Sequence, residues 1–104
     1  MSLPPADLIL VKDVLQQWST KDIADFLPKL ASYRHALVTN AWPLHQLPNG
    51  DIRSGEFRPL DLSRAPFQMP GEFVLNYDAP AERGRENKRV FLVAHTSAAL
   101  SALR

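Results

Sequence analysis

The sequence contains no cysteine, and its 104 residues include only four glycines. Without cysteine there is no disulfide, and no thiolate is available for nucleophilic or metal chemistry. None of the glycines follows an apolar run in a G-x-G pattern; they are Gly50, Gly55, Gly71 and Gly84. The sequence therefore encodes no glycine-rich loop of the kind that cradles phosphates or nucleotides.

Long apolar runs and a strong charge bias are also missing. No run approaches the ~20 residues that a membrane span needs, and no signal peptide precedes the first apolar stretch. We therefore expect a cytoplasmic protein without a membrane partner. The formal net charge is only +1, and the basic residues between Arg83 and Arg89 alternate with acidic ones. We read that stretch as a solvated hairpin loop and expect no nucleic-acid partner.

The composition is that of a folded protein. Hydrophobic residues make up 45% of the chain and charged residues 22%, which is typical of a globular domain rather than a disordered segment. We expect residues 1–104 to form a single unit. The three histidines, His35, His45 and His95, lack the spacing of metal ligands, so no metal site is expected.

The first apolar run, Leu8–Val11, is predicted to be a short strand buried on both faces, as in parallel sheets covered by helices. Lys12 and Asp13 follow it directly. Open α/β sheets bind their ligands at the carboxyl ends of parallel strands. These two side chains are therefore candidates for a functional site.

A helical pattern follows the first strand. Val11, Val14, Leu15 and Trp18 have the spacing of one helix face. Ser19, with Asp22 three residues later, is a helix-capping signal, and we expect a helix from Ser19 to about Ser32. Pro28 lies inside that helix and should kink it or separate its last turn.

Three further strands complete a predicted α/β fold of about four strands with one main helix. The second strand is Ala36–Thr39, and Asn40 lies at its end, beside Asp13 if the two strands are parallel neighbours. Residues 43–71 show no regular period but contain large apolar residues, which indicates an ordered flap over the site end of the sheet. Phe73–Tyr77 and Arg89–Ala94 are joined by a short polar connection and should form an antiparallel hairpin.

The blocks DLILVKDVLQQWS, DIADFL, HALVTN, NGDI, RPLDL and APF together resemble the C-terminal half of a class I S-adenosylmethionine-dependent methyltransferase. The resemblance is to a bacterial subgroup with LVKDVLQHWS and RPLDL motifs, and it extends from about Leu8 to Val93. It implies a partial Rossmann-like sheet and methyl transfer to an acceptor that we expect to be a small molecule. Gln17 stands where the subgroup usually has histidine.

The same resemblance makes the shortage of glycine informative. Relatives have a glycine-rich loop after their first strand and an acidic residue, ending the second strand, that holds the ribose of S-adenosylmethionine. This sequence has neither, as if the first three strands of the fold were missing. We therefore expect that the chain alone does not bind the cofactor and is inactive without an N-terminal half.

The resemblance suggests roles for residues at the strand ends. Asp13 either faces the methyl-transfer site as a catalytic residue or simply caps the following turn. Val11, Lys12 and Asp13 would form the floor of the cofactor site, although Lys12 also suits a surface lysine. Asn40 either hydrogen-bonds the acceptor or serves the turn.

Three further residues are candidates for substrate binding: Trp18, Trp42 and Arg58. The two tryptophans flank the strand ends and could stack on an acceptor, or they could serve packing. Arg58 could contact the acceptor, but we favour ion pairs among Arg58, Asp51, Arg53 and Asp61 that would lock the flap.

The expected half-fold also predicts how the chain associates. A strand Leu8–Val11 from the middle of a sheet would be left with an unpaired edge, which is a template for another strand. We expect either a twofold homodimer through this strand or pairing with the missing N-terminal half. The alternative to an enzyme fragment is a small, non-enzymatic α/β module that binds a protein partner.

Overall fold

The computed structural model describes residues 7–44, 49–81 and 84–94. It has four strands, one α-helix and two 3-10 helices. In chain order these are β1 Leu8–Lys12, η1 Leu15–Gln17, α1 Thr20–Phe26, η2 Leu27–Ser32, β2 His35–Ala41, β3 Gly71–Ala81 and β4 Gly84–Val93.

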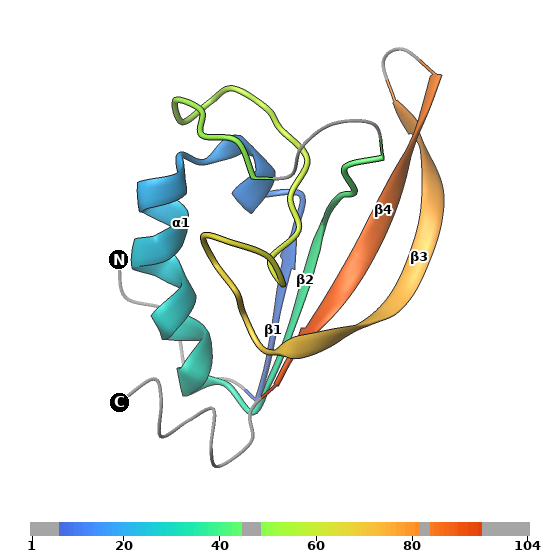
Figure 1. The fold of residues 1–104 in the computed structure, drawn as a ribbon. Coiled ribbons are helices and arrows are strands. Elements are labelled where there is room, and N and C mark those ends of the chain that lie inside the picture. Colours follow the sequence, from blue (N-terminus) through green and yellow to red (C-terminus); the bar gives the residue numbers. More distant parts are fainter. Residues whose placement is uncertain (1–6, 45–48, 82–83, 95–104) are drawn as a thin grey trace.

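The strands form one mixed sheet in the order β1-β2-β4-β3. β1 runs parallel to β2, with Leu10 opposite Leu37 and Lys12 opposite Thr39. β4 is antiparallel to both β2 and β3. The predicted α/β fold, its parallel pair and its terminal antiparallel hairpin are therefore confirmed. In Figure 1 the hairpin stands on the side of the sheet away from α1.

The main helix begins at its predicted cap. The Ser19 hydroxyl accepts a hydrogen bond of 3.2 Å from the Asp22 backbone N–H, which satisfies one of the free donors of the first turn. Proline removes a backbone donor, and the α-helix ends at Phe26, two residues before Pro28. The chain continues as the 3-10 helix η2 to Ser32. The prediction that Pro28 separates off the end of the helix is confirmed.

One face of the sheet is covered by the helices and by residues 60–69. The core cluster joins Val11 and Val38 from the sheet, Ile23 and Leu30 from the helices, and Leu62 from the irregular segment, all 7% exposed or less. Residues 49–70 thus contribute directly to the core. Figure 1 shows the yellow part of this segment lying between α1 and the sheet, and the green part near the end of β1.

The other face of the sheet, which we call the open face, lacks such a cover in the described part of the chain. Leu8 is 47% exposed and Leu10 66%, whereas Val11 on the covered face is 7% exposed. The prediction that the first strand is buried on both faces is therefore wrong. Only its odd-numbered side chains pack into the core.

The turn after β1 also differs from its prediction. The helical spacing through Val14 and Leu15 predicted one buried helix face, but this stretch is the single 3-10 turn η1. Leu15 is fully buried, whereas Val14 is 38% exposed. Asp13 has a φ of 58°, which turns the chain out of the strand before a longer helix can form.

The terminal hairpin is longer than predicted. β3 extends to Ala81 and β4 begins at Gly84, so most of the predicted polar connection is strand. A register shift between Phe73 and Leu75 marks a β-bulge in β3. The turn residues 82–83 and the predicted helical tail, Thr96–Arg104, lie outside the described residues.

Candidate functional site

Asp13 lies at the carboxyl end of β1, next to the end of β2. Its backbone N–H donates to the Thr39 carbonyl at 2.9 Å, so the residue is fixed to the neighbouring parallel strand. Its φ of 58° is in the left-handed region, which costs a non-glycine residue about 1–2 kcal/mol. Such strain is common where a side chain must be held in a particular direction.

The Asp13 side chain points toward Lys88 on β4. The Lys88 Nζ donates to Asp13 Oδ1 at 2.8 Å and lies 2.7 Å from Glu86 Oε1. The Lys88 side chain is 7% exposed, and those of Asp13 and Glu86 are 34% and 30% exposed. One ammonium thus joins two carboxylates at the carboxyl end of the parallel pair.

The pKa of Lys88 shows which effect prevails. Burial acts to lower this pKa, but hydrogen bonds and charge attraction from Asp13 and Glu86 outweigh burial and raise it above its ordinary value of 10.5. Lys88 therefore stays cationic at neutral pH. The arrangement carries a net negative charge, because one cation faces two anions.

The interpretation of Lys88 as part of a solvated loop was wrong. Its position 75 residues from Asp13 gives no local signal of their pairing. A signal for its burial does exist, since Lys88 alternates with Val90 and Leu92 at the period of a strand. Extending the strand backwards by that rule would have placed Lys88 on the sheet.

Asn40 lies within β2 rather than after it, and it is 5% exposed. Strand alternation puts Asn40 on the covered face with Val38, whereas Lys88 lies opposite Ala41 on the open face. Within the described residues, the Asn40 Oδ1 has no hydrogen-bond partner. Asn40 and Asp13 are thus neighbours in register.

Gln16 organises the turn between β1 and α1, although no sequence pattern selects this residue. It is 4% exposed, and its Oε1 accepts a 2.7 Å hydrogen bond from the Ala41 N–H. This bond ties η1 to β2 beyond the point where β1 ends. Gln17 is exposed, and its carbonyl accepts from the Gly55 N–H at 2.7 Å.

Arg58 lies against the same turn and is 7% exposed. Its Nη1 donates to the carbonyls of Leu15 and Gln16 at 3.3 Å each, and its backbone N–H also donates to Gln16. Burial lowers the pKa of the guanidinium, and the charge of Asp51 opposes this. Nε and Nη2 have no partner in the described part of the chain. Arg58 holds η1 from within rather than presenting its charge to solvent.

The other charged residues of this segment do not lock it as predicted. Asp61 pairs with Arg64 at 3.3 Å instead of with Arg58. Asp51 accepts from the Thr20 N–H at 2.9 Å, which adds a second acceptor at the start of α1. Hydrogen bonds from the backbone N–H groups of Thr20 and Ile52 lower the pKa of Asp51. Segment 49–70 is therefore held by backbone and capping contacts more than by ion pairs.

The two tryptophans pack against different parts of the molecule. Trp18 packs edge-on against Phe26, with ring centroids 5.4 Å apart, on the helical side. Trp42 packs edge-on against Phe73 at 5.1 Å, and the Arg89 guanidinium lies 4.0 Å from the Trp42 ring centroid. The Trp18 and Trp42 rings therefore do not line a common binding pocket.

Of the three predicted cofactor residues, Val11 is a core residue, and Lys12 and Asp13 reach solvent. The glycines with positive φ, which are Gly55, Gly71 and Gly84, lie outside the β1 turn. The described residues therefore form at most a floor for S-adenosylmethionine and do not by themselves fit it as a cradle.

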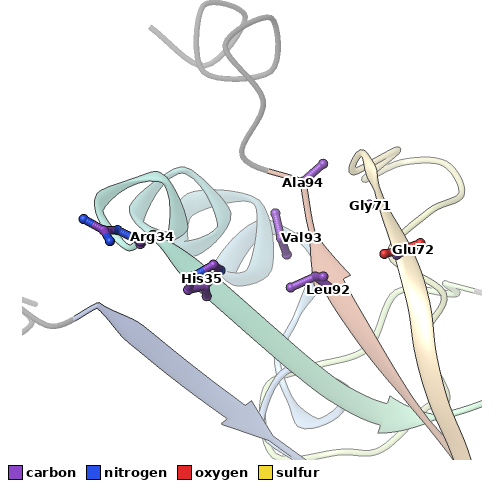
Figure 2. A pocket seen from close by; sticks show the side chains of 7 residues that line it. All are labelled: Arg34, His35, Gly71, Glu72, Leu92, Val93 and Ala94. Carbon is purple, nitrogen blue, oxygen red and sulfur yellow. The ribbon is translucent and has the colours of Figure 1, made fainter.

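Two hollows lie elsewhere on the molecule. Figure 2 shows the larger, about 550 Å³, between the start of β2, the start of β3 and the end of β4; it is lined by Arg34, His35, Gly71, Glu72, Leu92, Val93 and Ala94. A second, about 300 Å³, lies beside Trp18 and α1. The first is at the opposite end of β2 from Asn40, so it is separate from the Asp13–Lys88 pair.

Across residues 7–44, 49–81 and 84–94, no group of three His, Cys, Asp or Glu side chains is placed to hold a metal ion. No helix in these ranges is both long enough and apolar enough to cross a membrane. Comparison with known proteins found no matching family model, no similar curated protein and no similar solved structure.

Proposed function

We propose that this chain is the C-terminal part of a class I S-adenosylmethionine-dependent methyltransferase acting on a small-molecule acceptor. The observation that carries the proposal is the position of Asp13. It is held in a strained conformation at the carboxyl end of a parallel strand, and its carboxylate is fixed by the buried Lys88. Strand ends of this kind are where open α/β sheets bind ligands.

The sheet supports this assignment. In the proposal it is one end of a Rossmann-like sheet, with the parallel pair followed by the reversed hairpin. Segment 49–70 acts as the flap, since it contacts the turn after β1 and the end of β2: Arg58 N–H donates to Gln16 and Leu60 N–H to Ala41. The flap thus lies next to the end of the sheet that carries Asp13.

Within this chain we assign the acceptor side of the site. Asp13 Oδ1 accepts a hydrogen bond from Lys88 Nζ at 2.8 Å, which holds the carboxylate in one orientation. Its Oδ2 is available to accept a hydrogen bond or a proton from an acceptor hydroxyl or amine. Holding the acceptor in line removes much of the entropic barrier to its reaction. Arg58 acts on Asp13 indirectly, because it holds η1, the turn that follows Asp13.

The cofactor-holding groups have to come from another polypeptide segment, because the residues described here do not form the cradle. We therefore propose that the chain alone is inactive. Titration calorimetry of the isolated chain with S-adenosylmethionine should show no binding tighter than ~1 mM, which corresponds to about 4 kcal/mol. Binding tighter than that limit would contradict this division of the site.

The test of the function uses the natural protein, isolated through an affinity tag from cells that encode it. We expect cross-linking of radiolabelled S-adenosylmethionine to the polypeptide or polypeptides recovered. The Asp13→Asn variant should lose label transfer to acceptors in a small-molecule extract and keep cross-linking. Asp25→Asn, on the exposed face of α1, is the matched control and should keep both. Absence of cross-linking and of transfer in the natural protein would overturn the proposal.

The alternative function, a non-enzymatic α/β module that binds a protein, is favoured by the exposed apolar side chains of β1 and β3. Leu10 is 66% exposed and Leu75 56%. The same experiment separates the two. A natural polypeptide of 104 residues that neither cross-links the cofactor nor transfers methyl groups would favour the module. The cytoplasmic location expected from the sequence fits both.

A further inference from the structure

β1 has one edge that no described strand occupies. The sheet order places β1 at an end, next to β2 alone. The His35 N–H donates to the Asp7 carbonyl, and the Asp13 N–H donates to the Thr39 carbonyl, both at 2.9 Å. Odd-numbered residues of β1 therefore direct their backbone groups to β2. By the alternation of a strand, Leu8, Leu10 and Lys12 direct their N–H and C=O groups outward.

The same three residues place their side chains on the open face. Leu10 and Leu8 are 66% and 47% exposed. Native proteins protect edge strands with charges, prolines or bulges, but β1 carries a single charge, Lys12, at its end, and no proline or bulge. An unpaired backbone thus coincides with exposed leucines.

We propose that, where no N-terminal half occupies this edge, two copies of this chain associate through β1, antiparallel about a twofold axis perpendicular to the sheet. Leu10 lies opposite Leu10 of the second copy, and Leu8 lies opposite Lys12. Each of these pairs exchanges both backbone hydrogen bonds, so every outward group of the three residues is satisfied. A contact that uses the same surface on both partners closes on itself.

This register also places compatible side chains opposite one another across the two copies. A twofold axis of this orientation keeps the open faces of both copies on one side. The row Leu10, Leu37 and Leu92, which neighbour one another across β1, β2 and β4, then continues into the second copy. Lys12 lies opposite an apolar residue rather than another cation. The one like-charge pair, Asp7 opposite Asp13, is at the end, where Lys88 offsets the charge of Asp13.

The opposite edge of the sheet, β3, is the competing association site. Phe73, Val74 and Leu75 are 38%, 48% and 56% exposed. However, β3 contains a bulge between Phe73 and Leu75, and Pro80 lies near its end. A bulge twists an edge and a proline removes a donor, so both oppose pairing with another strand. β1 is the edge without these devices.

The absence of cysteine permits a direct test of the register. Leu10→Cys should form an interchain disulfide under mild oxidation, because opposed residues of an antiparallel pair lie about 5.5 Å apart, within the range a disulfide spans. Leu8→Cys is the matched control on the same face of the same strand. It lies opposite Lys12 rather than its own copy and should cross-link far less.

Association itself is measured by sedimentation velocity of the full chain. We expect a dimer at high micromolar concentration, its dissociation by Leu10→Lys, and no such effect of Leu75→Lys on β3. Circular dichroism confirms that each variant is folded. A folded wild-type monomer, equal cross-linking of the two β1 cysteine variants, or cross-linking of Leu75→Cys in place of Leu10→Cys would overturn the proposal.

Discussion

The covered and open faces of the sheet both carry apolar side chains, but only the covered face is packed against other elements. On the covered face, Val11, Val38 and Phe91 are 7%, 0% and 2% exposed. On the open face of the same strands, Leu10 is 66% exposed, and Leu37 and Leu92 are partly exposed. Apolar strand residues therefore show that a face can be buried, but a face is buried only where another element packs on it.

The largest expected effect is in the covered face. Leu62 is 2% exposed in segment 49–70, and Leu62→Ala should lower the free energy of unfolding by about 2–5 kcal/mol, through lost burial and a cavity. Leu10→Ala on the open face should change it by less than about 0.5 kcal/mol at low protein concentration. Urea unfolding of both variants measures the contrast. Equal losses would mean that the two faces are packed alike.

The next effect concerns the contact between β3 and β4. A methyl group at Gly71 would collide with the Leu92 carbonyl and lie 2.7 Å from the Phe91 ring. Gly71→Ala should therefore cost about 1–3 kcal/mol of stability and displace the start of β3. Gly50→Ala, where no atom lies within 4 Å, serves as the control. Thermal unfolding followed by circular dichroism checks both; an unchanged Gly71→Ala variant would contradict the close approach.

The ion pair on the open face gives a smaller effect with a pH signature. Lys88→Met should cost about 1–2 kcal/mol near neutral pH, since both carboxylates can return to water. Lys12→Met, an exposed lysine on the same face, should cost almost nothing. The partners raise the Lys88 pKa above 10.5, so the folded state holds this proton more tightly than the unfolded chain does.

The stabilisation by Lys88 is then complete below about pH 10.5, the ordinary lysine pKa, and is lost as the pH rises through the higher folded pKa. The difference between wild type and Lys88→Met should shrink in that alkaline range. Urea titrations at a series of pH values measure it. A difference that stays constant into strong alkali would show that packing, not charge, explains the role of Lys88.

The smallest expected loss of stability comes from the N-terminal cap of α1, the helix that packs on the covered face of the sheet. Ser19→Ala removes the hydroxyl that accepts from the Asp22 N–H and should cost about 1 kcal/mol. Ser32→Ala, at the exposed end of η2, should be near neutral. Hydrogen exchange of the first amides of α1 should increase in Ser19→Ala alone. Unchanged exchange there would mean that Asp51 at Thr20 caps the helix sufficiently.

Local patterns predicted much of the fold because their causes are local. Ser19 caps α1 through a residue three positions away, and Pro28 ends the regular helix by lacking a donor. The hairpin follows from a connection too short for a crossover helix. Five large apolar residues indicated an ordered segment: Phe57, Leu60, Leu62, Phe67 and Met69. Leu60, Leu62 and Met69 are in the core and Phe67 packs against it, whereas Phe57 is 51% exposed. Even here Val14 misled, because helical spacing cannot reveal that Asp13 turns the chain first.

The site was only half predictable. Asp13 could be selected from the sequence because it directly follows a strand, which is a property of neighbouring residues. Lys88, Gln16 and the inward course of Arg58 could not, because each depends on contacts made across 25 or more residues. The alternation of Lys88 with Val90 and Leu92 was the one available clue.

The sequence by itself determined which segments become strands and where the helix begins, since dihedral preference, capping and apolar spacing act over a few residues. Only the tertiary structure decided that β1 is buried on one face, that Leu10 faces solvent, and that Lys88 pairs with Asp13. These outcomes depend on which elements come to lie side by side. The physical reason is that burial and ion pairing act through space, whereas propensity acts along the chain.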